Sequence, residues 1–405
     1  MSDKLKGNLL VGQSGGPTAV INSSLCGVVQ EAMKHEQIQG IYGMVHGVLG
    51  LLREELIDLR REDPETIGLL RQTPSAALGS CRHKLKEADY GKILAIFQKY
   101  NIRYFHYIGG NDSQDTSNQI SKLAKDRGYE LRVMGIPKTV DNDLDVTDHS
   151  PGYGSVARFI ALATRDAGLD TEAIGVVDTV KVIETMGRNA GWITASAALA
   201  KDEPDDAPHL VYVPERAMDL DKFVADVQKV YERLGYAVVV VCEGVKNAQG
   251  ESIVASGSTL DVDSFGHKQH GGVGEFLCNV IKQRNKLKAR CDKPATIQRV
   301  FMLAASSVDV EEAYQVGAMA VRHAVEGKTD FMVTLVREPG DQYRCTTTGL
   351  ATLEDAANRE KKLPAHFINA EGNGITEAFV RYAAPLIGGP LPRYARLKKH
   401  RVTAL

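Results

Sequence analysis

Short apolar runs alternate along this chain with longer segments in which apolar residues recur at helical spacing. The runs are rich in Val, Ile and Tyr and are bounded by Gly, Pro or charged residues, which predicts buried strands. They are NLLVG (8–12), YFHYIGG (104–110), LRVMGIP (131–137), AIGVVDTV (173–180), HLVYVPE (209–215), YAVVVVCEG (236–244) and DFMVTLV (330–336). Because helical patterns separate most of them, we expect mostly parallel sheets joined by right-handed crossovers, in an α/β fold.

Two of the predicted strands end in a glycine turn. In parallel sheets ligands bind beyond the carboxyl ends of the strands, which is where these turns stand. In GQSGGPTAVIN (12–22), Gly15 and Gly16 let backbone N–H groups approach an anion, although glycine after a strand is more often a plain tight turn.

The second turn, GGNDSQDT (109–116), adds polar side chains to the glycines. Gly110 permits close approach, and Asn111, Asp112 and Ser113 offer oxygen ligands. Asp112 suits Mg²⁺, which prefers carboxylate and phosphate oxygens. The alternative is a helix N-cap, a position that Asn, Asp and Ser all favour.

A third loop, GIPKTVDNDLDVTDHSPGYGS (135–155), is acidic. Four aspartates fall within eight residues, preceded by Lys138 and Thr139. Metal–phosphate chemistry gives such acids a use, and one of them could serve as a base toward a substrate hydroxyl. A solvated acidic turn is the alternative.

Further charged residues stand near predicted strand ends. Arg188 follows Gly187 in VIETMGRNAGW (182–192) and is suited to bidentate contact with phosphate. Glu243 ends the strand at 236–244 and could accept sugar hydroxyls. Other arginines near glycine turns or strand ends are Arg82, Arg290 and Arg299.

Composition narrows the class of protein. The net charge of -2 gives no overall basic field for nucleic acid or membrane. The six cysteines include no CxxC pair, which favours reduced thiols in a cytoplasmic protein. The N-terminus lacks a signal-peptide pattern, and no run of about twenty apolar residues predicts a membrane span.

Taken together, the motifs resemble those of the phosphofructokinase family. They are GQSGGPTAVIN, GSCR, GGNDS, PKTVDND, MGRNAGW, CEG and IQR, in family order from about Gly12 to Arg299. The resemblance implies two Rossmann-like, three-layer domains with the active site in the cleft between them. It also implies phosphoryl transfer to the 1-hydroxyl of fructose 6-phosphate, with Mg²⁺.

The resemblance assigns roles to individual residues. Asp141 would be the base, acting with Lys138, Asp112 and Arg188, and the metal would lie at Asp112 or Asn111. The residues implied to hold the sugar phosphate are Thr139, Val140, Asp143, Met186, Gly187, Arg188, Glu243, Thr296, Arg299 and Arg290. Those implied to hold the phosphoryl donor are Gly15, Gly16, Arg82, Gly110, Ser113 and Lys138.

Two positions predict which donor is used. ATP-using members of the family carry glycine at the position of Asp112 and usually a small residue at that of Lys138, whereas pyrophosphate-using members resemble this chain at both. A carboxylate at 112 would occupy the space of the α-phosphate of ATP and repel it, while Lys138 would stabilise a departing phosphate. The sequence therefore predicts pyrophosphate as donor and a reaction that runs both ways.

Several departures leave alternatives open. The family usually has aspartate at the position of Asn111, so the metal could shift to Asp112 or be bound through water. Thr296 stands where the family has histidine or tyrosine, which admits a different acceptor such as sedoheptulose 7-phosphate. Asn111 also motivates a catalytically silent sugar-phosphate sensor. Arg290 matches a second arginine of the family that reaches across a subunit interface, by spacing alone.

The predicted organisation is two domains and a symmetric assembly. We expect a donor domain at 1–149 plus 298–360 and a sugar-phosphate domain at 150–297 plus 361–405. A homodimer is the default. The polar stretch 246–272 is predicted to be a surface or ligand-side loop, and the basic C-terminus a solvated tail.

Overall fold

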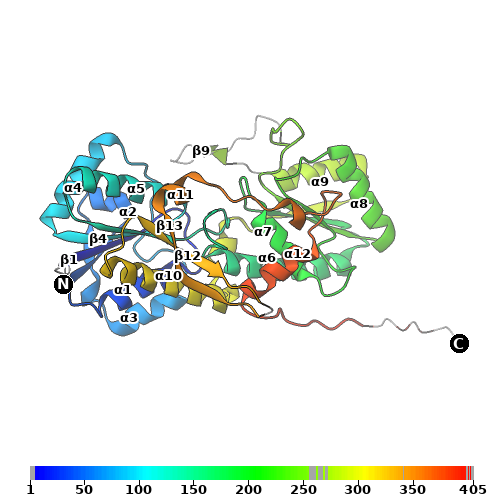
Figure 1. Ribbon diagram of the computed structural model, residues 1–405. Helices are drawn as coiled ribbons and strands as arrows, with labels where there is room; N and C mark the ends of the chain where they lie inside the picture. The colour runs from blue at the N-terminus through cyan, green and yellow to red at the C-terminus, as the bar shows by residue number, and fades with distance from the viewer. Residues whose placement is uncertain are drawn as a thin grey trace.

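The computed structural model describes residues 5–254, 261–262, 268–269, 272–340, 342–397, 400 and 402. Of the predicted loop at 246–272, residues 255–260, 263–267 and 270–271 lie outside the described residues. The chain forms two lobes, each with its own sheet, which lie side by side along the long axis of the molecule (Figure 1).

The first lobe contains a seven-stranded sheet. Its order is β13-β12-β5-β4-β1-β2-β3, and the neighbours from β12 to β2 run parallel, with an antiparallel strand at each edge. The strands are β1 (Gly7–Gln13), β2 (Ile38–Met44), β3 (Leu56–Asp58), β4 (Ile102–Gly109), β5 (Arg132–Pro137), β12 (Phe331–Arg337) and β13 (Cys345–Thr352).

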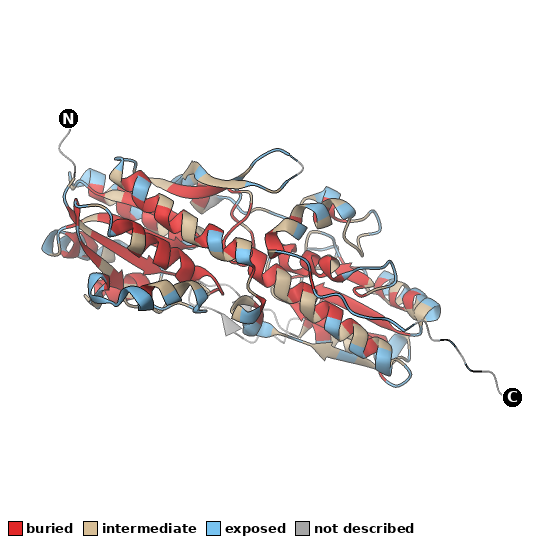
Figure 2. Ribbon diagram, turned by 90° about the horizontal axis from the view of Figure 1, so that it is seen from below, coloured by how far each residue is buried: buried red, intermediate tan, exposed pale blue. Residues whose placement is uncertain are grey.

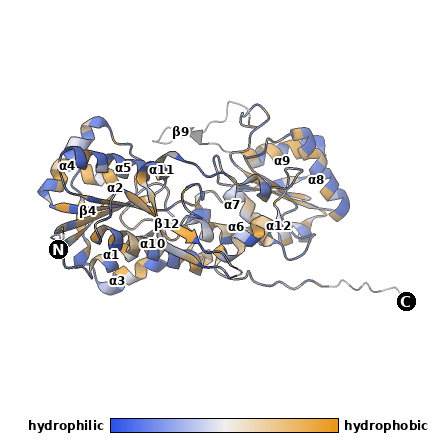
Figure 3. Ribbon diagram, viewed as in Figure 1, coloured by the Kyte–Doolittle hydropathy of each residue, from blue (hydrophilic) through white to orange (hydrophobic). Residues whose placement is uncertain are grey.

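Alternating side chains of these strands build two cores. Leu9 and Val11 of β1 pack on one face of the sheet with α1 (Ile21–Ala32) and α10 (Ser307–Val325). Leu10 packs on the other face with α2 (Gly47–Leu52), α4 (Glu87–Lys99) and α5 (Asn111–Asp126). Because helices cover both faces of the sheet, the central strands are apolar on both sides, and their sequences are continuous runs of hydrophobic residues (Figures 2 and 3).

The second lobe repeats this three-layer plan with a smaller, fully parallel sheet. Its order is β11-β6-β8-β7, with β6 (Val180–Thr185), β7 (Leu210–Tyr212), β8 (Ala237–Cys242) and β11 (Ala289–Asp292). Val238 and Val240 of β8 face α6 (Tyr153–Ile174) and α12 (Glu377–Ala383). Val239 and Val241 face α8 (Leu220–Leu234) and α9 (Val273–Arg284). The predicted α/β fold with mostly parallel sheets is thereby confirmed.

The remaining elements are short. Within the described residues they are α3 (Pro64–Leu69), α7 (Trp192–Ala195), α11 (Leu353–Asn358), the two-residue strands β9 (Asp261–Val262) and β10 (Lys268–Gln269), and seven 3₁₀ turns. The 3₁₀ turns lie at 59–61, 70–72, 196–200, 295–299, 302–304, 365–367 and 384–387.

The chain passes between the lobes more than once. Strands of the first sheet come from residues 7–137 and 331–352, and those of the second from residues 180–292. The crossings follow β5, η4–η5 (295–304) and α11. The boundaries at 149/150, 297/298 and 360/361 remain a proposal.

One predicted strand is wrong. The run 173–180 contains the end of α6 and a turn, and β6 begins only at Val180. Val176 is 96% exposed and Val177 54% exposed, so these valines pack against neither sheet. Residues 173–179 pair with no strand among the described residues, whereas the segment VKVIET (180–185) pairs with both β8 and β11.

Two expectations about the surface can also be compared with the structure. Among the described helices, none is both long and apolar enough to cross a membrane. The basic segment near the C-terminus makes specific contacts where it is described: Arg396 pairs with Glu172 at 2.6 Å and Asp206 at 2.7 Å, and the Tyr394 hydroxyl donates to Asp166.

Candidate active site

One cavity of about 570 Å³ gathers most of the residues that the sequence singled out. It lies where the carboxyl ends of strands from both sheets face each other, as the fold predicts. Its lining is Gly15, Gly16, Arg82, Gly110, Asn111, Asp112, Ser113, Lys138, Thr139, Val140, Asp141, Asp143, Met186, Gly187, Arg188, Asn189, Ala190, Glu243, Arg299, Ala357, Arg359 and Glu360.

The turn after β5 carries the densest chemistry. The Asp141 N–H donates to Thr139 Oγ1 at 3.1 Å, and the Thr139 N–H donates to Pro151 O at 3.2 Å. Asn142 adopts a left-handed backbone with φ of 53°, and its buried side-chain oxygen accepts the Ser150 N–H at 3.0 Å. These bonds close the turn on itself and hold Asp141 toward the cavity.

Lys138 is buried at the floor of the cavity. Its side chain is 4% exposed, and its Nζ donates to the carbonyl oxygen of Gly16 at 2.9 Å. Burial, with a smaller contribution from Arg299, lowers the pKa of Lys138 to about 8, while Asp141 and Asp143 oppose this shift. Lys138 therefore links the turn after β5 to the first glycine loop. Its lowered pKa lies much closer to neutral pH than that of an ordinary lysine.

Asp141 has the opposite perturbation. Burial makes the largest contribution to raising the pKa of Asp141 above its ordinary value of 3.8, and the neighbouring carboxylates of Asp143 and Glu243 raise it further. The positive charges of Arg188 and Lys138 oppose this shift. Burial raises the pKa of Asp143 as well. Carboxyl groups whose pKa is displaced in this way are suited to accept a proton from a substrate hydroxyl.

The second glycine loop leads directly into α5. Gly110 occupies the N-cap position, so Asn111, Asp112 and Ser113 form the first turn of the helix. Asp112 is exposed to the cavity, at the helix end where negative charge is favoured. The N-cap alternative is therefore not realised by Asn111 or Asp112, because both already lie within the helix.

The opposite wall is formed by the loop after β6 and the end of β8. Gly187 has φ of +139°, and a Cβ there would lie 2.8 Å from both Ala190 O and Cys242 Sγ, so the position requires glycine. Its N–H donates to Glu243 Oε1 at 3.2 Å. The Met186 N–H donates to the side-chain oxygen of Gln298 at 3.3 Å, which ties this loop to the 295–299 turn that carries Arg299.

One wall of the cavity is not predicted by any motif of the sequence. We call residues 357–362 the strap; they comprise the end of α11 and the segment after it, and they bond to three loops of the site. Asn111 Nδ2 donates to Arg359 O at 3.0 Å, the Lys361 N–H donates to Asp143 O at 2.8 Å, and Lys362 Nζ donates to Asn189 O at 2.8 Å. The strap sequence ANREKK carries charge but neither glycine nor a strand end, so no pattern marks it. Asn189 and Ala190 follow the MGR motif directly, and that adjacency could have identified them.

Two residues implied by the family resemblance are absent from the lining. Thr296 is exposed on the 295–299 turn. Arg290 lies on β11, where it pairs with Asp178, and its side chain is 58% exposed. The remaining site residues named from the sequence all line the cavity.

The donor atoms fit a hard divalent cation such as Mg²⁺. Asp112, Asp141 and Asp143 present carboxylates to one cavity, which is the ligand chemistry that Mg²⁺ prefers. Among the described residues, Asn111 Oδ1 is buried without a hydrogen-bond partner, while its Nδ2 is engaged by the strap. Of the two predicted metal positions, Asp112 therefore presents a carboxylate to the cavity, whereas the side chain of Asn111 makes a structural hydrogen bond to the strap.

Two three-layer α/β lobes with arginine, lysine and carboxylate side chains converging at their strand ends are typical of enzymes that act on phosphorylated small molecules. The family model described as Phosphofructokinase matches residues 8–324, and the chain belongs to this family.

Near full-length relatives agree with this assignment. The chain is 44% identical to a pyrophosphate–fructose 6-phosphate 1-phosphotransferase of Xanthomonas campestris, over 97% of this chain and 96% of that protein. It is 43% identical to a protein of the same name from Halomonas elongata, over 98% and 97% of the two chains. The crystal structure of a pyrophosphate-dependent phosphofructokinase from Marinobacter aquaeolei superposes with a TM-score of 0.86 at 40% identity, covering 98% of each chain.

Proposed function

We propose that this protein transfers a phosphoryl group from pyrophosphate to the 1-hydroxyl of fructose 6-phosphate, reversibly and with Mg²⁺. The products are fructose 1,6-bisphosphate and phosphate. The observation that carries the proposal is that Lys138 and Asp112, the two residues expected to select the donor, line the same cavity. The names of the near full-length relatives support the same activity.

Asp141 acts as the general base in this proposal. The hydroxyl oxygen of the sugar forms a bond to phosphorus, its proton passes to Asp141, and the bridging P–O bond of pyrophosphate breaks. The raised pKa of Asp141 makes it a stronger base than an ordinary aspartate. The support for this role is its place beside the basic residues of the cavity and its motif in the family.

Lys138 stabilises the phosphate that departs. Pyrophosphate has no adenosyl group, so its leaving phosphate develops charge that a buried ammonium can neutralise. The Nζ of Lys138 already lies against Gly16 at the edge of the first glycine loop, where the donor is expected. Because the cavity is partly buried, this charge acts in a lower dielectric than water.

The remaining lining residues position the two substrates. Arg188 and Arg299 suit the sugar phosphate, and Glu243 suits the sugar hydroxyls. Gly15, Gly16, Arg82 and Gly110 also line the cavity and suit the pyrophosphate. Mg²⁺, held by Asp112 with the nearby carboxylates, would neutralise charge on the pyrophosphate oxygens.

A donor assay tests the proposal directly. Purified protein with Mg²⁺ and fructose 6-phosphate would receive pyrophosphate or ATP, and fructose 1,6-bisphosphate would be followed by a coupled reaction. We expect turnover with pyrophosphate and little with ATP. Turnover with ATP alone would overturn the donor assignment, and binding of fructose 6-phosphate without turnover by either donor would indicate the silent sensor.

The acceptor is tested in the same assay. Fructose 6-phosphate and sedoheptulose 7-phosphate would be compared by kcat/KM, with pyrophosphate as donor. Thr296, which motivated the alternative acceptor, does not line the cavity, so the structure adds no support to it. A higher kcat/KM for sedoheptulose 7-phosphate would nevertheless reassign the acceptor.

The proposal includes a cytoplasmic homodimer with neither nucleic-acid nor membrane partners. All six cysteines are described and none forms a disulfide, which suits a reducing compartment. Light scattering coupled to size-exclusion chromatography would measure the mass in solution. A mass of one chain would contradict the dimer without affecting the proposed reaction.

A further inference from the structure

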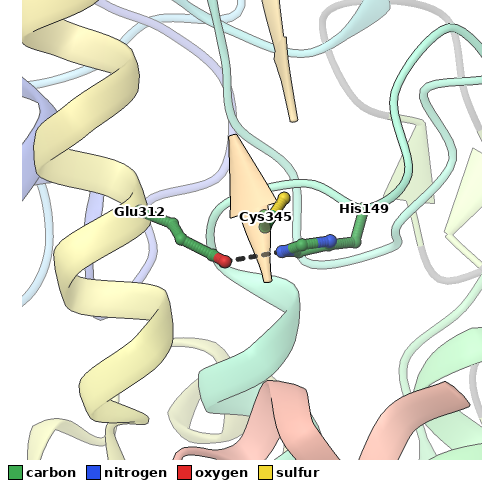
Figure 4. Close-up of side chains that lie close together, drawn as sticks. All are labelled: His149, Glu312 and Cys345. Atoms are coloured by element: carbon green, nitrogen blue, oxygen red, sulfur yellow. Dashed lines mark hydrogen bonds and ion pairs between the residues drawn. The ribbon is translucent and has the colours of Figure 1, made fainter. Parts of the chain in front are cut away.

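Outside the cavity, three metal-ligating side chains converge from distant parts of the chain. His149 ends the turn after β5, Glu312 lies on α10, and Cys345 begins β13. A ring nitrogen of His149, a carboxylate oxygen of Glu312 and the Cys345 sulfur all lie within 4.8 Å of one another. Figure 4 shows Cys345 beside the hydrogen bond that joins Glu312 to His149.

We propose that His149, Glu312 and Cys345 bind one zinc-like divalent cation. Nitrogen, sulfur and oxygen donors together are a zinc ligand set, with bonds of about 2.0–2.3 Å. Such bonds place neighbouring tetrahedral ligand atoms roughly 3.3–3.8 Å apart, so small movements from the present positions suffice. Mg²⁺ demands oxygen ligands in octahedral geometry and does not compete for this set.

The surroundings of the three residues match what metal ligands require. His149 Nδ1 lies 2.8 Å from Asp148 Oδ2, an arrangement that orients a ligating histidine and fixes its tautomer. The hydroxyl of Tyr343 donates to the other carboxylate oxygen of Glu312 at 2.5 Å. Both ligands therefore already have the outer hydrogen bonds that metal sites use.

The charges also balance when a cation binds. His149 is 1% exposed, its two ring nitrogens lie 2.8 Å from Asp148 and 2.6 Å from Glu312, and Arg337 pairs with Asp148 at 3.1 Å. A divalent cation would replace the proton between His149 and Glu312 and the thiol proton of Cys345. Two protons leave and two positive charges arrive, so the net charge of the buried group is unchanged.

A second cluster provides a matched comparison. Glu184, Glu275 and Cys291 also lie close together, but this group has no histidine, and Lys293 Nζ pairs with Glu184 at 2.8 Å. The ammonium group of Lys293 therefore already occupies the position that a cation would take. We therefore expect the first cluster to bind the metal and the second not to.

Cobalt binding tests the proposal, because Co²⁺ substitutes for zinc and gives a thiolate charge-transfer absorption in the near ultraviolet. The full-length protein would be titrated with Co²⁺ in excess Mg²⁺, and bound metal counted after desalting. We expect one cobalt per chain and the absorption in both wild type and Cys291→Ser. In Cys345→Ser the absorption disappears, while turnover with pyrophosphate is kept.

Other outcomes overturn the proposal. They are absence of the absorption from the wild type, its persistence in Cys345→Ser, or its loss in Cys291→Ser. Should Cys345→Ser fail to fold, Tyr343→Phe provides the second measurement. Loss of this outer hydrogen bond should weaken cobalt binding about 10-fold or more, and an unchanged affinity would contradict the site.

Discussion

The side-chain amide of Asn111 donates a hydrogen bond to the backbone carbonyl of Arg359, over 3.0 Å. This bond joins the first turn of α5 to the strap, 248 residues further along the chain. It gives Asn111 a structural role at a position where the family usually has aspartate, and Asp112 is the carboxylate that this loop presents to the cavity.

Asp112 rather than Asn111 should therefore determine the affinity for Mg²⁺. We expect Asp112→Asn to raise the Mg²⁺ concentration at half-maximal rate by about tenfold, since a charged ligand is lost. Asn111→Asp should not lower that concentration, because it removes the bond to Arg359. The measurement is a Mg²⁺ titration of turnover with pyrophosphate, and tighter Mg²⁺ use by Asn111→Asp would return the metal to position 111.

Replacing Asp141 should remove most of the chemistry. Asp141→Asn keeps the shape of the side chain but cannot accept the proton, so kcat should fall by about 10²–10⁴. Binding of fructose 6-phosphate, measured by calorimetry, should change little. Asp145→Asn is the matched control, since Asp145 lies in the same turn but is exposed and outside the cavity lining. Near-normal kcat in Asp141→Asn would exclude Asp141 as the base.

Lys138 should affect the leaving phosphate more than the sugar. Lys138→Met retains the volume and removes the charge, so we expect kcat to fall by about 10²–10³ with little change in KM for fructose 6-phosphate. The exposed Lys92→Met provides the control for loss of a lysine. A large rise in KM at constant kcat would instead assign Lys138 to substrate binding.

Asp112 should also govern exclusion of ATP. Asp112→Gly removes the carboxylate that repels and obstructs the α-phosphate, and we expect measurable ATP binding in this variant. Efficient ATP use should need Lys138→Gly in addition. Because glycine weakens a helix end, Asp115→Gly, one turn further along α5 and outside the lining, serves as the control. If Asp112→Gly still fails to bind ATP, another residue selects the donor.

The pH dependence should have two limbs. The base must be ionised, so kcat/KM should rise with pH through the pKa of Asp141, which burial raises well above 3.8. The ammonium must be protonated, so kcat/KM should fall as pH passes the lowered pKa of Lys138, about 8. Lys138→Met should abolish the alkaline limb only, and a profile that is flat between about pH 5 and 7 would contradict the assignment of Asp141.

The local pattern of the chain predicted strands β1, β4, β5, β7, β8 and β12 but none of the strands β2, β3, β11 and β13. Val238 to Val241 form a continuous apolar run because helices cover both faces of β8, and such runs indicate buried parallel strands. The run at 173–180 shows the limit of this reasoning. Its valines are apolar yet exposed, since a strand also needs partners, and pairing cannot be read from one segment.

The sequence by itself determined which loops carry the chemistry, because glycines after strands and clustered acids leave a local mark. Asp112, Lys138 and Asp141 belong to such loops, and each lines the cavity. Only the tertiary structure decided that the strap closes one wall and that Thr296 and Arg290 lie outside the lining. It alone brought His149, Glu312 and Cys345 together. The physical reason is that a local motif depends on backbone conformation within a few residues, whereas these contacts depend on how distant segments pack.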